Sequence, residues 1–156
     1  MRSILFVCLG NICRSPLADG IANKIAREKG LELYIDSAGT SSFHKGESPC
    51  ENSQKVAKKY GVDISKLKSR PIVPKDLEEF EIVVAMDEQN RKDLLSYGFK
   101  KVYKLGDFGG LGGKDVPDPY YYVGFKGFEV VYEMIQKGVE DLIKQVVSGK
   151  LDAKNI

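Results

Sequence analysis

Two sulfur atoms and a guanidinium group lie close together near the start of the chain, in the segment VCLGNICRSP (residues 7–16). Such a loop can hold a metal, act as a redox pair or bind an anion. A zinc or iron–sulfur site needs about four ligands, but the chain has three cysteines, one histidine and no C-x2-C pair. A thioredoxin-like redox site requires C-x-x-C, whereas four residues separate Cys8 from Cys13. We therefore expect no metal, no cofactor and no dedicated redox centre here.

An anion-binding site would explain why Arg14 and Asn11 occur in this segment. A guanidinium in the first turn of a helix lies against the positive end of the helix dipole, which is unfavourable unless an anion is shared there. Gly10 and Asn11 tolerate the left-handed backbone that lets successive amides wrap a tetrahedral oxyanion. Arg14 would hold that oxyanion with its bidentate fork, and Cys8 would be a thiolate near neutral pH. A thiolate at the floor of a phosphate pocket predicts nucleophilic attack on phosphate monoesters.

The segment also carries a family resemblance. CLGNICRS (residues 8–15) matches the C-x5-R-[ST] signature of cysteine-dependent phosphatases. VCLGNICRSP together with the late DPYY (residues 118–121) resembles the low-molecular-weight protein tyrosine phosphatase family, over nearly the whole chain. The resemblance implies one domain over residues 1–156, with a three-layer α/β fold around a four-stranded parallel sheet in the order 2-1-3-4. It also implies hydrolysis of phosphotyrosine and small aryl phosphates through a phosphocysteine intermediate.

The same resemblance suggests roles within the loop. Cys8 would attack phosphorus, and Arg14 with the loop amides would stabilise the equatorial oxygens. Ser15 can place its hydroxyl against the Cys8 sulfur, although a serine at a helix start is also common. Asn11 would hold the loop through side-chain hydrogen bonds, one of them to Ser37.

An acid is needed to protonate the leaving group. Asp118 matches the family's aspartate, and Pro119 stiffens its surroundings. Asp115 and Asp107 lie in the same loop and remain alternatives on chemical grounds alone.

The pocket walls are expected to be aromatic and apolar. Tyr120 and Tyr121 follow the acid directly, and Phe43 matches an aromatic position in the family's variable loop. The expected substrate-binding residues are Leu9, Gly10, Asn11, Ile12, Cys13, Ser15, Phe43, Tyr120 and Tyr121.

One departure from the family pattern concerns support of the loop. Many relatives have a histidine shortly before the position of Arg70, whereas here the stretch is SKLKSRP, with Leu67 or a neighbour in its place. His44 lies in a polar segment and is expected to be solvated.

Three other functions are compatible with parts of this sequence. An arsenate reductase shares the fold but needs further cysteines, and Cys50, at the start of a predicted helix, has no expected partner. A phosphoarginine phosphatase is disfavoured by Ile12, because relatives of that kind carry threonine there. A phosphate-binding module without catalysis is disfavoured by the intact set of Cys8, Arg14 and Asp118.

Two roles are open for Cys13. It can pack beneath a helix, since free cysteine is among the most buried residue types. We also hypothesise that it traps an oxidised Cys8 as a disulfide, which would protect Cys8 from over-oxidation.

Apolar runs alternate with segments of helical periodicity along the chain. This pattern predicts the strands and helices that position these residues. The alternation predicts a parallel sheet with helices on both faces, and ligands of such sheets bind beyond the carboxyl ends of the strands. The loop after the first strand and the loop at 106–123 should therefore meet. Strands are expected at 3–8, 31–38, 81–86 and 101–105, and helices at 14–29, 49–60, 74–80, 88–97 and 126–147. Ser48 with Glu51 is expected to form a capping box, and Asp87 to cap the helix that follows it.

Composition limits the partners. The 156 residues carry a net charge of +2 from 24 basic and 22 acidic side chains, which is too balanced to indicate nucleic acid or a membrane surface. No apolar run approaches the ~20 residues that span a bilayer, and we interpret the apolar start as a buried strand rather than a signal peptide.

An odd number of cysteines favours free thiols in the cytoplasm. The implied partners are phosphotyrosine-containing proteins, with inorganic phosphate and similar oxyanions as inhibitors.

Overall fold

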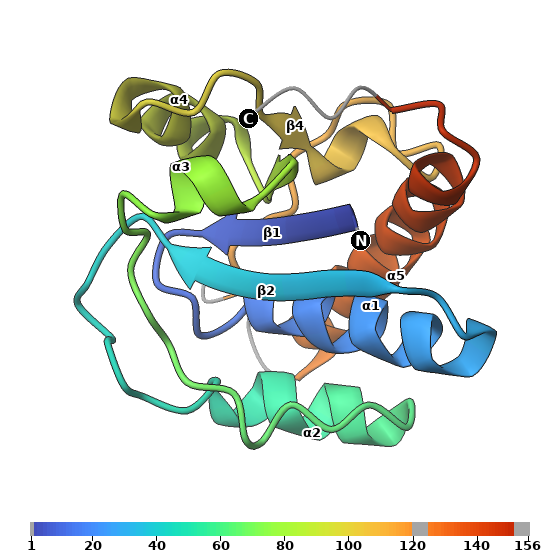
Figure 1. Ribbon diagram of the computed structural model, residues 1–156. Coiled ribbons are helices and arrows are strands. Elements are labelled where there is room, and N and C mark those ends of the chain that lie inside the picture. Colours follow the sequence, from blue (N-terminus) through green and yellow to red (C-terminus); the bar gives the residue numbers. More distant parts are fainter. Residues whose placement is uncertain (1, 120–124, 152–156) are drawn as a thin grey trace.

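A four-stranded parallel sheet in the order β2-β1-β3-β4 forms the centre of the protein, as the family resemblance implies. The structure is a computed structural model that describes residues 2–119 and 125–151 (Figure 1). The strands are β1 Arg2–Cys8, β2 Leu33–Gly39, β3 Ile82–Ala85 and β4 Tyr103–Lys104. The helices are α1 Ser15–Lys29, α2 Glu51–Lys59, α3 Asp76–Glu79, α4 Glu88–Tyr97, the 3-10 helix η1 Leu105–Asp107 and α5 Lys126–Val147.

β1 is buried on both faces because it is an inner strand of a sheet covered on both sides. Ile4, Phe6 and Cys8 belong to the apolar cluster shared with α1, α2 and α5. Leu5 and Val7 point the other way, into a smaller cluster between the sheet and α3 and α4. The unbroken apolar run of the first strand therefore reflects two cores rather than one.

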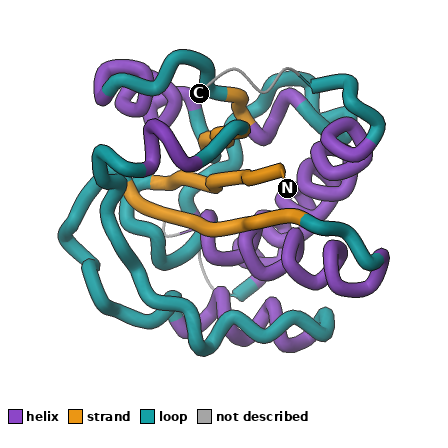
Figure 2. Tube along the Cα trace, in the orientation of Figure 1, coloured by secondary structure: helices purple, strands orange, loops and turns teal. Residues whose placement is uncertain are grey.

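The helices form the outer layers of a three-layer arrangement. α1, α2 and α5 lie on one side of the sheet and α3 and α4 on the other (Figure 1). Figure 2 shows the long loops that connect strands to helices at the edge where β1 and β2 end. Cys8 pairs in register with Gly39, so both strands reach this edge together. Among the described residues, no helix is both long and apolar enough to cross a bilayer.

The N-termini of α4 and α2 show which of the two predicted helix caps is formed. Asp87 caps α4 by accepting a hydrogen bond from the Asn90 N–H at 2.7 Å, as predicted. The predicted capping box of Ser48 and Glu51 is wrong, because α2 begins at Glu51 with Cys50 as its N-cap and no side-chain cap. The tertiary contact of the Cys50 N–H with a carbonyl of the loop after β1, and not a local side chain, fixes where this helix starts.

We expect Ile135→Ala in α5 to lower the free energy of unfolding by about 2–5 kcal/mol, because the side chain is fully buried and its removal leaves a cavity. Urea unfolding measures the change. Glu133→Ala, an exposed position two residues earlier on the same helix, is the control and should change stability by less than about 0.5 kcal/mol. Equal effects of the two substitutions would contradict the packing described for α5.

Candidate active site

The loop from Cys8 to Ser15, here called the 8–15 loop, connects β1 to α1 and curls around Asn11. Asn11 has φ of 55°, and it is the one residue other than glycine with positive φ in the described part of the chain. A left-handed residue at this point turns neighbouring backbone N–H groups toward one centre, which is the geometry of an anion nest. The Asn11 N–H itself points at the Cys8 sulfur, at 3.2 Å.

The Asn11 side chain holds this conformation with three hydrogen bonds. Its Nδ2 donates to Ser15 Oγ at 2.8 Å and to Ser37 Oγ at 3.0 Å. Its Oδ1 accepts from the Arg70 N–H at 3.1 Å. Because these partners lie on α1, on β2 and in the segment after α2, the amide ties the loop to three separate parts of the fold. The expected contact between Asn11 and Ser37 is therefore present.

Ser69 supports the 8–15 loop from the segment just before Arg70. Its Oγ donates to the carbonyl oxygen of Gly10 at 2.8 Å, whereas Leu67 packs against the main core. A serine hydroxyl next to Arg70 was not singled out in the sequence, and only the fold shows that it reaches the loop. His44 donates or accepts through Nδ1 with Glu47 Oε2 at 2.8 Å and lines the cavity described below.

The Cys8 sulfur belongs to a residue that is only 2% exposed and lines the cavity described below. Besides the Asn11 N–H, Ser15 Oγ lies 3.1 Å from it. Ser15 Oγ accepts the Asn11 amide proton, which leaves its own hydroxyl proton to be directed at the sulfur. When Cys8 is ionised, the sulfur thus accepts two hydrogen bonds, and these stabilise the anion.

Arg14 is buried and is held by two residues that do not belong to the described lining of the cavity, Asp87 and Val116. Its Nη1 donates to Asp87 Oδ2 at 2.7 Å and to the Val116 carbonyl at 3.0 Å. Burial lowers the pKa of Arg14, but the charges of Cys8 and Asp87 and the Asp87 hydrogen bond outweigh it, so the pKa is raised. Both bonds use Nη1, so the fork formed by Nε and Nη2 is the part that can face an oxyanion. The sequence marks Asp87 as a helix cap; its second role, orienting Arg14, depends on tertiary structure.

A cavity of about 380 Å³ opens above the loop and gathers residues from distant segments. Asp118 lies in its lining with Cys8 and Arg14, so the loops after β1 and before α5 do meet. The other two acids of that loop bond elsewhere: Asp115 accepts from the Glu88 N–H and the Lys104 ammonium, and Asp107 accepts from the Lys104 N–H. Among the described residues, the lining consists of Cys8, Leu9, Gly10, Ile12, Cys13, Arg14, Ser41, Phe43, His44 and Asp118.

The structure places some of the residues that are expected to form the walls of this cavity. Phe43 is 84% exposed and packs edge-on against His44, with ring centroids 4.8 Å apart. Leu9 is also exposed, and both side chains stand at the rim. Tyr120 and Tyr121 lie outside the described residues, so the structure does not place them. Ser41 and His44 were not among the predicted lining residues, because only the packing of the segment after β2 brings them there.

The thiol of Cys50 has a partner, contrary to the expectation from sequence. Cys13 Sγ lies 2.6 Å from Cys50 Sγ, and Ser53 Oγ lies 3.0 Å from the Cys50 sulfur. The prediction that Cys50 stands alone is therefore wrong, because the N-terminus of α2 docks on the 8–15 loop. No disulfide joins the three cysteines, and Cys13 contacts Cys50 with its sulfur.

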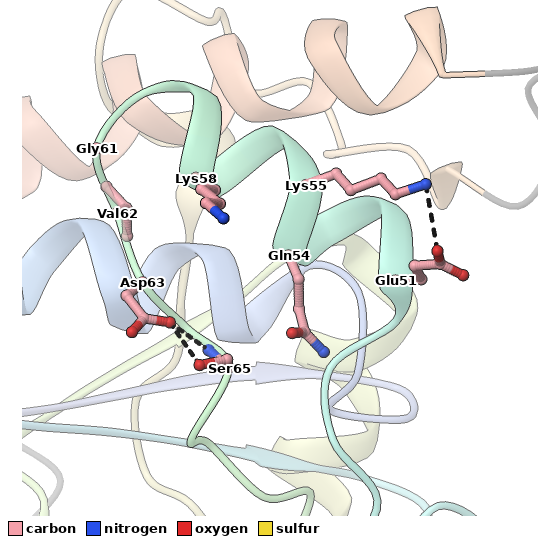
Figure 3. A pocket seen from close by; sticks show the side chains of 8 residues that line it. All are labelled: Glu51, Gln54, Lys55, Lys58, Gly61, Val62, Asp63 and Ser65. Atoms are coloured by element: carbon pink, nitrogen blue, oxygen red, sulfur yellow. Dashed lines mark hydrogen bonds and ion pairs between the residues drawn. The ribbon is translucent and has the colours of Figure 1, made fainter.

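A larger cavity of about 500 Å³ lies beside α2 (Figure 3). Among its lining residues, Lys55 pairs with Glu51 at 3.2 Å, and Asp63 accepts hydrogen bonds from the hydroxyl and N–H of Ser65. No cysteine or histidine lines it. The smaller cavity above the 8–15 loop is therefore where nucleophile, cation and acid converge.

A buried acid, Asp19 of α1, is linked to the loop through Ser37. Ser37 accepts from Asn11 and donates to Asp19 Oδ2 at 2.9 Å, and Asn23 donates to Asp19 Oδ1 at 2.6 Å. Burial raises the pKa of Asp19 to about 7; Ser37 and Asn23 oppose this rise, and the nearby charge of Asp36 adds to it. Its place among the apolar positions of α1 was the sequence signal that could have identified it.

The comparisons with known proteins agree over nearly the whole chain. A model of the family described as low molecular weight phosphotyrosine protein phosphatase matches residues 3–151. The chain is 39% identical to the low molecular weight protein-tyrosine-phosphatase YfkJ of Bacillus subtilis, over 96% of this chain and 99% of that protein. A crystal structure of a protein tyrosine phosphatase from Entamoeba histolytica matches the fold with a TM-score of 0.90 at 38% identity, covering 97% of this chain and 100% of the other.

A relative named for a different substrate is also similar. The crystal structure of an arginine phosphatase from Drosophila matches with a TM-score of 0.84 at 29% identity, over 94% of this chain and 98% of the other. The fold alone therefore does not separate the two substrate classes.

We expect the stability of the protein to depend on pH through Asp19. Because its pKa is about 7 in the folded state against an ordinary value of 3.8, the native state binds the proton more tightly than the unfolded state. The contribution of Asp19 to the free energy of unfolding should thus fall as pH rises from about 4 to about 7, by at most about 4 kcal/mol. In urea unfolding at pH 5 to 8, Asp19→Asn should gain stability relative to wild type as pH rises.

The control for this experiment is Asp63→Asn. Asp63 is exposed, and its hydrogen bonds from Ser65 hold its pKa below the ordinary value, so it is ionised throughout this range. Its substitution should shift stability equally at every pH tested. A difference between Asp19→Asn and wild type that stays constant with pH would contradict the buried, proton-binding state of Asp19.

Proposed function

Because the chain belongs to the low molecular weight phosphotyrosine protein phosphatase family, we propose that it hydrolyses phosphotyrosine and small aryl phosphates through a phosphocysteine intermediate on Cys8. The observation that carries the proposal is the convergence of Cys8, Arg14 and Asp118 on one cavity. These three side chains come from two distant segments and supply a nucleophile, a phosphate clamp and an acid.

In the first step the Cys8 thiolate attacks phosphorus in line with the ester oxygen. The sulfur–phosphorus bond forms as the bond to the leaving oxygen breaks. The Asn11 N–H and the Ser15 hydroxyl stabilise the thiolate before attack and again when it departs. Arg14, held by Asp87, presents its guanidinium fork to the equatorial oxygens, whose charge it stabilises in the transition state.

Asp118 acts as the acid and then as the base in this proposal. It donates a proton to the leaving phenolate oxygen in the first step. It then takes a proton from the water that attacks phosphocysteine, which releases inorganic phosphate and restores the thiolate. Asp115 and Asp107 are held by backbone and lysine partners, which supports assigning the role to Asp118.

The rim favours an aromatic phosphoester. Phe43 and Leu9 offer apolar surface at the opening, and Ile12 adds an aliphatic side chain without a hydroxyl. Such surfaces suit a phenyl ring better than a charged guanidinium group. We propose Tyr120 and Tyr121 as further walls.

The biological setting follows from the same chemistry. Substrates would be phosphotyrosine-containing proteins, and inorganic phosphate and similar oxyanions would compete for the loop. Free thiols suit a reducing compartment, so we propose that residues 1–156 act as one domain in the cytoplasm. The Cys13–Cys50 contact removes one argument against arsenate reductase chemistry, but the acid in the cavity favours hydrolysis.

We expect Cys8→Ser to lower kcat for p-nitrophenyl phosphate by at least about 10³-fold, because an alcohol at this pocket is a far poorer nucleophile than a thiolate. Steady-state kinetics measure the change. The variant should still bind inorganic phosphate, which calorimetry can follow. Undiminished hydrolysis in Cys8→Ser would overturn the mechanism. Wild-type protein that binds phosphate without hydrolysing phosphotyrosine, phosphoarginine or aryl phosphates would instead identify a binding module.

We expect Asp118→Asn to slow hydrolysis by about 10²-fold or more for phenyl phosphate, whose leaving group needs a proton, and by less for p-nitrophenyl phosphate. A series of aryl phosphates of graded leaving-group pKa gives the slope. Asp115→Asn, in the same loop but outside the cavity, is the matched control and should leave that slope unchanged. The assignment of Asp118 fails if both variants give the wild-type slope, or if only Asp115→Asn alters it.

A further inference from the structure

We propose that Cys13 and Cys50 form a second thiol site, which a two-electron oxidant such as a peroxide converts into a Cys13–Cys50 disulfide while Cys8 remains a thiol. This reaction is separate from phosphate ester hydrolysis and does not depend on it. It differs from the hypothesis drawn from the sequence, in which Cys13 traps an oxidised Cys8 as a disulfide.

The main chain already holds the two sulfur atoms together. The Cys50 N–H donates to the Ile12 carbonyl at 2.8 Å, and Ser53 Oγ donates to the Cys13 carbonyl at 2.9 Å. These bonds fix the start of α2 against the 8–15 loop on both sides of the thiol pair. The Sγ atoms lie 2.6 Å apart, and a disulfide bond length is about 2.05 Å. Closing the bond therefore needs only a small side-chain movement.

The two thiols have different environments, which assigns their roles. Cys50 is partly exposed and is the N-cap of α2, where the positive end of the helix dipole stabilises a thiolate. The hydrogen bond from Cys13 lowers the pKa of Cys50 to about 7, and Ser53 assists, while burial opposes. Cys13 is buried, and its hydrogen bond to Cys50, with burial, raises its pKa. Within this pair, Cys50 is thus the thiolate that meets an oxidant first, and Cys13 is the resolving thiol.

The chemistry balances with a peroxide as oxidant. The Cys50 thiolate attacks one peroxide oxygen, so an S–O bond forms, the O–O bond breaks and hydroxide leaves. The Cys13 sulfur then attacks the Cys50 sulfur; the S–S bond forms, the S–O bond breaks, and the oxygen leaves with a proton as water. Two thiols lose two electrons in total, and hydrogen peroxide is reduced to two waters.

The Cys8 and Cys13 sulfur atoms have different hydrogen-bond partners in this arrangement. The Cys8 sulfur is held by the Asn11 N–H and Ser15 Oγ, whereas the Cys13 sulfur contacts Cys50. A Cys8–Cys13 bond would require Cys13 to turn away from Cys50. Oxidation of the second thiol site would instead fix the 8–15 loop to α2 without consuming the nucleophile.

The test is to oxidise the full-length protein and map its disulfides. Wild type and Cys8→Ser are treated with one equivalent of hydrogen peroxide, with inorganic phosphate present to occupy the cavity, and are then digested without reduction and analysed by mass spectrometry. We expect a Cys13–Cys50 cross-linked peptide in both proteins, formed at equal rates. A Cys8–Cys13 link as the main wild-type product, or failure of Cys8→Ser to form any link, would overturn the proposal.

A second measurement separates the site from an incidental contact. Oxidised wild type should keep most of its phosphatase activity after peroxide is removed and should show a Tm several degrees higher, because the new bond closes a long chain loop. Cys50→Ser, which preserves size and polarity, should fold normally and show no such rise. A rise in Tm in Cys50→Ser, or loss of wild-type activity in parallel with cross-linking, would count against the site.

Discussion

The side-chain amide of Asn11 is the interaction on which the arrangement of the cavity depends. A left-handed backbone costs a residue other than glycine about 1 kcal/mol or more, and the three hydrogen bonds of the amide, each about 1 kcal/mol, offset that cost. Ser15 and Ser37 receive its two protons, and the Arg70 N–H meets its oxygen. Because Ser37 and Arg70 are distant from Asn11 in sequence, the loop reaches its conformation only when β2 and the segment after α2 are in place.

A second constraint is the burial of charge. A guanidinium as enclosed as Arg14 is stable only beside compensating anions, and Asp87 supplies one at 2.7 Å while Cys8 supplies another when ionised. Asp87 also caps α4, so the start of that helix and the orientation of Arg14 are fixed by one carboxylate. The Val116 carbonyl adds the loop before α5 to the same cation. The cavity is therefore assembled from three strand ends around a single guanidinium.

Local patterns were sufficient for a parallel sheet with helices on both faces and for the residues of the 8–15 loop, whereas the strand order came from the family resemblance. Strand and helix periodicity predicts the parallel sheet, and the loop signature predicts which residues surround Cys8. The features that sequence could not supply all depend on contacts between distant segments: Ser69 under the Gly10 carbonyl, Cys50 beside Cys13, and the true start of α2. Propensity describes a helix and its neighbours in sequence, but it does not show which loop that helix will touch.

The depth of the reactive sulfur has a consequence for the shape of the substrate. Cys8 is 2% exposed, while Phe43 at the rim is 84% exposed. A phosphoryl group must therefore be carried inward on a side chain long enough to leave its own peptide backbone outside. A phenyl ring provides that length in a rigid, flat form, whereas a phosphorylated hydroxymethyl group would need the main chain to enter as well. The depth of the cavity thus selects substrates first by the length of the side chain that carries the phosphoryl group, and only then by the chemistry of that side chain.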